Sequence, residues 1–343
     1  MRDLLVAGGG PIGLATALHA TRAGLDVAVL EPREGVIDKA CGEGLMPGAV
    51  AALAGLAVRP AGHPITGIRY VEARLDGRSA EAPFRHGTGL GVRRTELHAT
   101  LTAAVEHAGV PVRHRAVQSV EDRGDYLVVD GEPTRFLVAA DGLHSPLRRM
   151  LGVDRPARTR RRYGQRCHVA VAPWTSYVEV HWAPVGEAYV TPVGPDQVGV
   201  AVLTDQRRPW EDLVADFPAL AERLTGLGVS RVRGAGPLRQ RARRRAVGRV
   251  LLVGDAAGYV DALTGEGIAL GLAQSRAAVT AIATGRPQAY ELAARRLGWR
   301  HELLTRVLLT STRPPALRER IVPAAARLPR VFGTAVDQLA RPA

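Results

Sequence analysis

Residues 3–31, DLLVAGGGPIGLATALHATRAGLDVAVLE, decide the fold of this chain. A short apolar run leads directly into Gly8-Gly9-Gly10-Pro11-Ile12-Gly13, and a helix-like segment follows as far as Ala23. A second apolar run then ends in the acid Glu31. This order predicts a strand, a glycine-rich turn, a helix and a second strand, which is the pattern of a dinucleotide-binding unit.

Each part of this unit has a physical role. Gly8, Gly10 and Gly13 permit the tight turn, the approach of a pyrophosphate and the close packing of helix on strand. The helix N-terminus offers free N–H groups to phosphate. Glu31 can accept hydrogen bonds from a ribose diol, and it disfavours a 2′-phosphate there. The sequence contains no second such unit, because Gly234-Ala235-Gly236 lacks the third glycine.

A second glycine-rich stretch, residues 250–271, reads VLLVGDAAGYVDALTGEGIALG. Its apolar run ends in Gly254-Asp255, and Gly258, Gly265 and Gly267 precede a helical pattern. Glycines let the backbone approach a ligand closely, so this pattern predicts a ligand-binding turn. We expect it to meet the N-terminal glycine motif, although most of the chain separates the two.

Composition narrows the class of protein. The chain has 343 residues and a net charge of +13, carried almost wholly by arginine because Lys39 is the only lysine. The arginines gather in residues 158–166 and 239–245. This bias fits a GC-rich coding genome, or alternatively a surface for anionic partners such as an acidic carrier protein. No aromatic platform beyond Tyr163 interleaves the arginines, which weakens a nucleic-acid hypothesis.

The cysteine content and the apolar runs of the sequence mainly exclude classes of site and of protein. Cys41 and Cys167 are the only cysteines, and without a CxxC pair they predict neither a disulfide framework nor a zinc site. We find no signal peptide and no apolar run that approaches a membrane span. The sequence therefore predicts a cytoplasmic protein without metal or stable membrane insertion.

The middle of the chain predicts a second layer. Residues 65–72 and 79–85 alternate around Asp76-Gly77 as in a hairpin, and residues 95–107 predict an amphipathic helix. Residues 163–173, 176–182, 188–192 and 197–203 predict an antiparallel sheet with one face available for a small molecule. Residues 210–224 predict one helix.

Two polar loops complete the inventory. Residues 39–47, KACGEGLMP, predict either a ligand-facing loop or a surface turn, and no nearby histidine would activate Cys41 as a nucleophile. Asp141, His144 and Ser145 follow an apolar strand within one turn. A catalytic triad needs side chains that converge from separate elements, so we expect Asp141 to contact a cofactor instead.

Four stretches now stand in order: GGGPIG with Glu31, Arg94 with Leu97, DGLHSPLR and GDAAGYVDALTGEG. Together they resemble the p-hydroxybenzoate hydroxylase-like FAD flavoproteins, a superfamily that includes class A flavoprotein monooxygenases and the geranylgeranyl reductase family. The resemblance implies an α/β fold with a Rossmann-like, GR2-type FAD-binding domain, a smaller antiparallel β-sheet substrate domain and C-terminal helices. We expect the FAD-binding domain in residues 1–62, 87–157 and 235–286, the substrate domain in 63–86 and 158–234, and a helical segment in 287–343.

The resemblance also implies site residues. Those expected at FAD are Gly8, Gly10, Pro11, Ile12, Gly13, Glu31, Pro32, Arg33, Cys41, Arg94, Val117, Asp141, Gly142, Gly254, Asp255, Gly265, Glu266, Gly267 and Ile268. Apart from the resemblance, the candidates to contact the substrate are His168, His181, Trp182 and Tyr189 of the predicted antiparallel sheet and Met46 of residues 39–47. No side-chain acid or base is obligatory in such a mechanism, so the catalytic residues stay unknown.

Three functional hypotheses follow. The first is an NAD(P)H-dependent monooxygenase of secondary metabolism that hydroxylates or epoxidises an aromatic or polycyclic molecule through a flavin C4a-hydroperoxide, with NAD(P)H as transient donor. The second is a geranylgeranyl reductase-like reductase of C=C bonds, because CGEGLMP and YVTPVG look closer to that family. The third is a basic nucleic-acid or carrier-protein binding protein without redox chemistry. The halogenases of this scaffold have a WxWxIP motif that this chain lacks.

Overall fold

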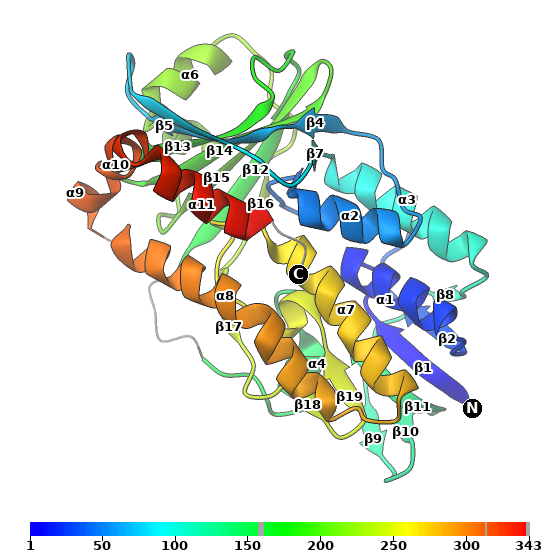
Figure 1. Cartoon of the computed structure of the whole chain (residues 1–343). Helices are drawn as coiled ribbons and strands as arrows, with labels where there is room; N and C mark the ends of the chain where they lie inside the picture. Colours follow the sequence, from blue (N-terminus) through cyan, green and yellow to red (C-terminus); the bar gives the residue numbers. More distant parts are fainter. Residues whose placement is uncertain (157–160, 313, 341–343) are drawn as a thin grey trace.

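The structure is a computed structural model that describes residues 1–156, 161–312 and 314–340. Two β-sheets lie one above the other, with helices packed against their outer faces and between them (Figure 1). The expected α/β fold class is confirmed. Arg158 and Arg160, which belong to the first arginine cluster, lie outside the described residues, as do residues 313 and 341–343 of the C-terminal segment.

The first sheet has a parallel centre. Its main path is β18 (Ala246–Val247), β19 (Val250–Leu252), β11 (Glu132–Ala139), β1 (Arg2–Ala7), β2 (Val27–Leu30) and β8 (Val112–Arg113). The β9 (Val120–Asp122) and β10 (Leu127–Val129) hairpin extends β11. Leu4, Leu5 and Val6 of β1 are fully buried, because helices or a hairpin cover both faces of a parallel sheet.

Helices cover the two faces of this sheet unequally. The face of Leu4 and Val6 packs against α1 (Pro11–Arg22), α3 (Arg94–His107) and α7 (Gly267–Ala283). The face of Leu5 and Ala7 packs against the short α4 (Pro146–Met150) and the β9–β10 hairpin. The carboxyl ends of β1, β2, β11 and β19 consequently meet at one edge, which is where open α/β sheets bind ligands.

The second sheet has seven strands. Their order is β16 (Arg233–Ala235), β12 (Tyr163–Val169), β15 (Gln197–Thr204), β14 (Gly186–Gly194), β13 (Tyr177–Ala183), β5 (Gly67–Glu72) and β6 (Ser79–Pro83). Neighbours are antiparallel except β13 and β5, which run parallel. The strands of this sheet are therefore those that the sequence predicts within residues 65–85 and 163–203. β16 joins them at one edge.

One face of the second sheet packs against two helices where one was predicted. α5 (Trp210–Ala215) and α6 (Pro218–Leu224) are separated at Phe217, whose backbone is non-helical at φ −121° and ψ 71°. Pro218 causes the break, because proline disfavours a helical conformation at the preceding residue. Its own place at the first position of α6 suits it, since the N–H it lacks would be unsatisfied there.

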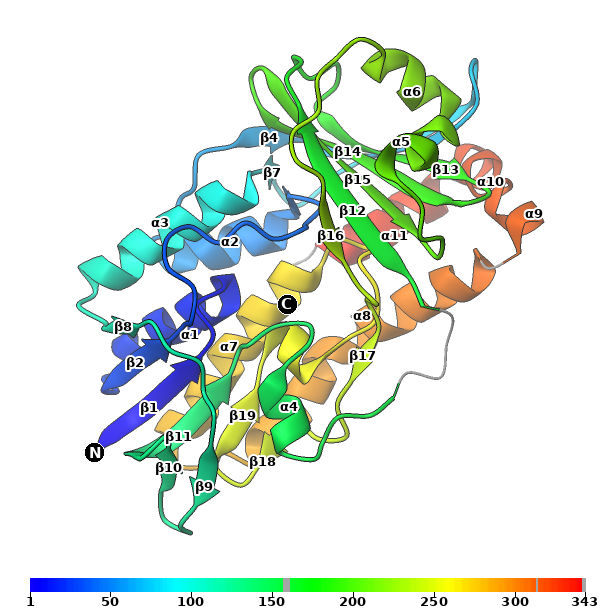
Figure 2. The same ribbon diagram turned by 180° about the vertical axis from the view of Figure 1, so that it is seen from behind.

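Smaller elements join the two sheets. β3 (Gly44–Leu45), β7 (Gly89–Gly91) and β4 (His63–Ile65) form a three-stranded sheet beside α2 (Pro47–Gly55), and β17 (Gln240–Arg241) pairs with β20 (Gly258–Tyr259). The C-terminal segment forms α8 (Ala289–Ser311), α9 (Pro315–Arg318), α10 (Ile321–Arg327) and α11 (Pro329–Ala340). Figures 1 and 2 show α11 running back under the second sheet toward the middle of the molecule.

Candidate functional site

A cavity of about 520 Å³ lies between the two sheets. Its polar end is formed by the turn after β1, residues 30–43, the start of α3, and the turns after β11 and β19. Its apolar end is formed by the second sheet and the C-terminal helices. Segments from opposite ends of the chain thus meet here, as the sequence predicted for the two glycine-rich stretches.

The turn after β1 brings backbone to the cavity wall. Gly8 has φ +108°, and a Cβ there would lie 2.4 Å from the Ala140 carbonyl oxygen. A Cβ on Gly13 would lie 1.8 Å from the Gly8 carbonyl oxygen. Gly8, Gly10, Pro11 and Ile12 line the cavity, whereas Gly13 packs behind it. Glycine is required here for close approach of backbone to backbone.

Glu31 stands at the carboxyl end of β2, where a ribose acceptor is expected. One carboxylate oxygen accepts the Gly9 N–H at 2.7 Å, and the other accepts Arg33 Nε at 2.7 Å. Burial raises the pKa of Glu31, but the hydrogen bonds from Arg33 and Gly9 outweigh burial and hold that pKa below its usual value. The carboxylate is therefore charged, and Pro32 and Arg33 beside it also line the cavity.

Two buried polar groups at this end have unmet hydrogen-bonding capacity. Arg94, at the first turn of α3, is 8% exposed, and within the described residues its Nη1 has no partner. Asp141 accepts the Leu147 N–H at 3.0 Å through Oδ2, while its Oδ1 has no partner there either. Both line the cavity, so a ligand with anionic oxygens and hydroxyls would satisfy them.

Burial also moves the pKa values of these two groups. Burial lowers the pKa of Arg94, and the nearby Cys41 and Asp255 partly oppose the shift. Burial raises the pKa of Asp141, against hydrogen bonds from Ser145 and Leu147. Both pKa shifts arise because water cannot fully solvate these two side chains. Gly142 and Val117 line the same end of the cavity.

The loop after β19 faces the cavity with backbone and small side chains. Asp255, Gly265, Gly267 and Ile268 line it. Gly254 instead lies on a second cavity of about 190 Å³ behind the turn, where its N–H donates to Gln274 Oε1 at 2.8 Å.

Glu266 turns away from the wall. Its carboxylate accepts a hydrogen bond from His301 Nδ1 at 2.7 Å, which draws the side chain toward α8. Any contact of this residue with a ligand in the cavity would be through its backbone.

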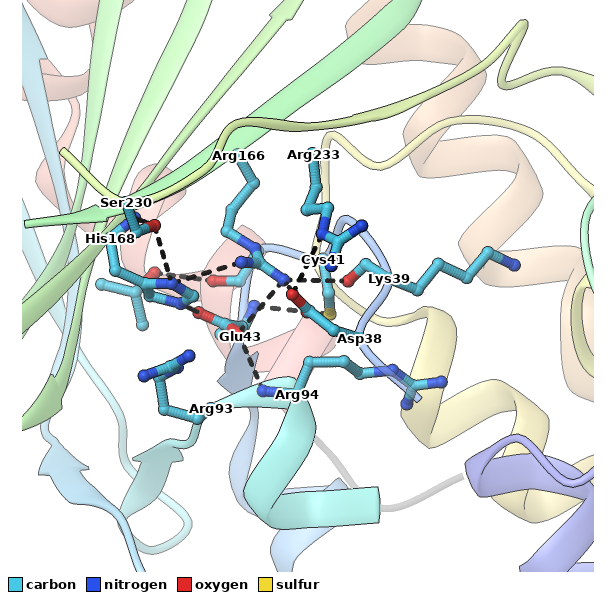
Figure 3. A network of polar contacts seen from close by, with 12 residues as sticks. Asp38, Lys39, Cys41, Glu43, Arg93, Arg94, Arg166, His168, Ser230 and Arg233 are labelled. Carbon is cyan, nitrogen blue, oxygen red and sulfur yellow. Dashed lines mark hydrogen bonds and ion pairs between the residues drawn. The ribbon is translucent and has the colours of Figure 1, made fainter. Parts of the chain in front are cut away.

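Residues 38–46 form one wall, and the polar contacts that hold them converge on Glu43 (Figure 3). The side chain of Glu43 is buried, and its backbone is in the left-handed region at φ +60°. Its Oε1 accepts the Arg94 N–H at 2.8 Å, and its Oε2 lies 2.7 Å from His168 Nε2. An acid between two glycines at residues 42–44 was the only sequence signal for this residue, and we did not predict its role.

His168 has a defined tautomer in this network. Arg166 Nη1, which can only donate, lies 3.2 Å from His168 Nδ1. In the neutral ring the proton is therefore on Nε2, which donates to Glu43. Arg166 also binds Asp38 and the Lys39 carbonyl, so strand β12 holds both ends of residues 38–43.

Side chains of the second sheet, of the loop after β19 and of the C-terminal helices form most of the apolar end of the cavity. Tyr189 lines it, and its hydroxyl donates to the Leu263 carbonyl at 2.8 Å. Met46 lines it as well. Other apolar residues there include Ile65, Ile68, Tyr70, Val178, Val180, Leu263, Leu308, Val336 and Leu339.

Three of the expected substrate residues do not line the cavity. His181 lies on the opposite face of β13 from Val178 and Val180, where it bonds Glu179 at 3.2 Å, because alternate residues of a strand face opposite ways. Trp182 shares the face of Val180 but packs against Tyr70 further along the strand. His168 is screened from the cavity by its contact with Glu43.

The polar end fits FAD. It offers a glycine turn at a helix N-terminus for the pyrophosphate, a charged acid at the end of β2, and the unsatisfied Arg94 and Asp141 groups. Cys41 lines the same end, and burial raises the pKa of its thiol. Among the described residues, no group of three or more His, Cys, Asp or Glu side chains could hold a metal ion.

Known proteins place the chain in a family. Residues 1–287 match the family model described as FAD binding domain. Menaquinone reductase from Mycolicibacterium smegmatis is 32% identical over 316 residues, which cover 82% of this chain and 76% of that protein. Digeranylgeranylglycerophospholipid reductase 1 from Methanothermobacter thermautotrophicus is 26% identical over 332 residues, covering 86% and 80%.

A solved structure gives the same fold. p-Nitrophenol 4-monooxygenase from Pseudomonas putida superimposes with a TM-score of 0.82 over 99% of this chain and 98% of that one, at 18% identity. At this identity the likeness concerns the fold alone. With the family match over residues 1–287 and the geometry of the polar end, the conclusion is that the chain belongs to the FAD-binding flavoproteins and is an FAD-dependent oxidoreductase.

Proposed function

We propose that this protein reduces a C=C bond in a prenyl chain or a similarly extended apolar substrate. The observation that carries the proposal is the apolar end of the cavity, which continues without a break from the loop at Gly265 to Leu308 of α8 and Val336 of α11. A long hydrocarbon fits such a wall better than a small polar molecule does. The reductase names of the relatives at 32% and 26% identity support the same reaction class.

The polar end would hold the cofactor. The turn at Gly8 and Gly10 would take the pyrophosphate, Glu31 the adenosine ribose, and Arg94 and Asp255 the part between pyrophosphate and ring. Bound there in its reduced form, the flavin would supply a hydride for one carbon of the double bond, and a proton would complete the reduction at the other. NAD(P)H is proposed as the transient donor that restores the reduced cofactor.

The chain's own residues orient the substrate and exclude water. Tyr189, fixed by its bond to the Leu263 carbonyl, and Tyr70 present rings to the cavity. Val178 and Val180 present branched side chains from β13. A dry wall of this kind strengthens the electrostatic interactions at the reacting atoms and prevents side reactions.

The test is anaerobic. Holoenzyme reduced with dithionite is mixed with a prenylated naphthoquinone, and the product is reoxidised in air before mass analysis. We expect a product two hydrogens heavier than the starting quinone, because the quinone ring reoxidises in air whereas a saturated chain bond does not. An unchanged mass for prenyl substrates of every length would overturn the proposal.

A second candidate is an NAD(P)H-dependent monooxygenase of an aromatic or polycyclic molecule. The rings of Tyr70 and Tyr189 in the wall favour it, because aromatic rings pack well on a flat polycyclic substrate. Oxygen consumption that rises in step with product, together with incorporation of one oxygen atom from labelled O₂, would select this candidate over the reductase.

A further inference from the structure

The outer face of α8 exposes an unusual number of large apolar side chains. Seven of the twelve large apolar residues that are exposed among those described come after residue 290. Four of them belong to α8, namely Leu292, Trp299, Leu303 and Val307, and each is more than half exposed. Single exposed apolar residues are common, but a cluster on one element marks an interaction surface.

These four residues share one face of the helix. They are spaced seven, four and four residues apart, which at 3.6 residues per turn places them in one stripe. The opposite face of α8 is buried through Tyr290, Ala294, Gly298, His301 and Thr305. Figure 1 shows α8 on the outside of the molecule beside α7, so the stripe faces outward.

Arginines flank this stripe. Arg295, Arg296, Arg300 and Arg306 are all exposed, and the guanidinium of Arg300 lies 5.4 Å from the ring centre of Trp299. The acids of the helix, Glu291 and Glu302, are partly buried and pair with Arg295 and Arg306. The exposed part of the helix is therefore apolar and basic, without an exposed acid. We call this surface, formed by the four apolar residues and the four arginines, the α8 face.

We propose that the α8 face binds the surface of an anionic phospholipid bilayer, with the helix lying in the plane of the interface. Tryptophan and arginine are the side chains that the interface favours, and basic residues beside an apolar stripe attract anionic headgroups. Insertion across the bilayer is not implied, because none of the described helices is both long and apolar enough to cross a membrane.

Helix α8 contributes to both the α8 face and, on another side of the helix, the wall of the cavity. Val307 is exposed on the α8 face, while the next residue, Leu308, lines the apolar end of the cavity. One helix thus touches both the proposed bilayer and the substrate space. If the proposed function holds, a prenylated substrate would pass from bilayer to cavity along α8; this step rests on the proposed function, whereas bilayer binding does not.

The experiment is co-sedimentation of the FAD-loaded protein with vesicles. We expect binding to vesicles of phosphatidylcholine mixed with phosphatidylglycerol, weak binding to phosphatidylcholine alone, and release by salt. Trp299 also reports directly, because Trp182 and Trp210 are buried and Trp174 is partly covered. Brominated lipids should quench its fluorescence in the bound protein.

Variants separate the two contributions. Trp299→Ser with Leu303→Ser should weaken binding on the order of ten-fold or more, since it removes the apolar stripe. Arg296→Gln and Arg300→Gln should each weaken binding to anionic vesicles about five-fold. Leu75→Ser is the matched control, because Leu75 is 53% exposed in the β5–β6 hairpin, away from α8.

Two results would overturn the proposal. One is equal binding of wild type and the Trp299→Ser, Leu303→Ser variant to anionic vesicles. The other is self-association through these residues in sedimentation velocity without vesicle binding, which would assign the α8 face to a second copy of the chain. Turnover of a short prenyl substrate in detergent, expected to be unchanged in this variant, reports on the proposed function separately.

Discussion

Single residues at the polar end of the cavity are proposed to hold the cofactor. Asp255 follows the strand β19 and lines the cavity, and Arg148 fixes its backbone by donating to the Asp255 carbonyl at 3.3 Å. The carboxylate is therefore presented from a rigid turn. A hydroxyl of the ribityl chain is the proposed partner.

Asp255→Ala should yield folded protein that binds FAD roughly ten- to a hundred-fold more weakly, because a hydrogen bond to a charged group contributes about 1.5–3 kcal/mol. Titration of apoprotein with FAD, followed by flavin fluorescence, measures the change. Glu266→Gln is the matched control, since Glu266 is in the same loop but bonds His301 away from the cavity. Full FAD affinity in Asp255→Ala would contradict the assignment.

Asp261 makes stability depend on pH. Burial is the main cause that raises its pKa to about 6; Arg162 opposes the shift, and the buried Glu187 adds to it. An unfolded Asp ionises near its ordinary value of 3.8, so between these values the folded state binds more protons than the unfolded state. The contribution of this group to stability therefore falls as pH rises from about 4 to about 6 and is constant above.

Asp261→Asn should abolish this fall in stability between about pH 4 and pH 6. Relative to wild type, the variant should gain about 3 kcal/mol of unfolding free energy between pH 4 and pH 7, an order-of-magnitude figure from two pKa units. Urea unfolding across this pH range measures it. Asp125→Asn, at a fully exposed site, should show no such difference. A parallel pH profile for Asp261→Asn and wild type would refute the prediction.

At the scale of elements, residues 38–46 are tied to strand β12 by buried charge. Glu43 joins His168 of β12 to the backbone of Arg94 in α3, and Arg166 of β12 joins Asp38. The contacts join the second sheet to α3, which packs on the first sheet, and they hold residues 38–43, with Cys41, at the cavity. The rigidity of this wall of the cavity therefore depends on the contacts of residues 38–46 with β12.

Glu43→Gln keeps the size of the side chain but removes its charge beside His168 and Arg166. It should lower the unfolding free energy by roughly 2 kcal/mol, because the amide oxygen can accept only one of the two hydrogen bonds, from Arg94 N–H or from His168 Nε2, and that bond loses its charged acceptor. Urea unfolding measures this value. Glu121→Gln, in an exposed pair with Arg123, should change stability by less than about 0.5 kcal/mol. Equal effects of the two substitutions would contradict a role for the network.

Sequence reasoning succeeded where function and local pattern coincide. The glycines before α1 and the acid after β2 predict both the strand–turn–helix unit and a dinucleotide ligand, because this local pattern combines close packing of the backbone with the approach of a phosphate. It failed where long-range packing decides. Nothing near His181 shows which face of β13 meets the cavity, and nothing near Glu43 reveals that β12, far along the chain, supplies its partner.

At the scale of the whole molecule, the cavity needs the N-terminal turn, the second sheet and the C-terminal helices at once. The sequence predicted that helices would follow the FAD-binding part, but not that α11 would run back beneath the second sheet. Val336 of α11 is 3% exposed and lines the far end of the cavity. The length of substrate that fits should therefore depend on a helix far from the cofactor.

Val336→Trp should shorten the longest prenyl chain that the enzyme accepts while leaving FAD binding unchanged, because the larger ring fills the apolar end. Turnover of substrates of increasing chain length measures the limit, and the flavin absorbance of the purified variant shows that it folds. Val331→Trp is the matched control on the same helix, at a site 63% exposed. The same length profile in both variants would rule out this end as the substrate space.

The pairing of β11 with β19 has a consequence for synthesis on the ribosome. β1, β2 and β11 are complete once residue 139 has emerged, and β10 already pairs with residues 132–134 on the other edge of β11, but the partner of residues 137–139 on that edge is residues 250–252. Until then the nascent chain carries an unpaired apolar strand edge, which is a template for aggregation. The part of the chain that is made in the interval includes most of the second sheet. Expression of this protein should therefore depend on chaperones that shield the unfinished first sheet until the last parallel strand arrives.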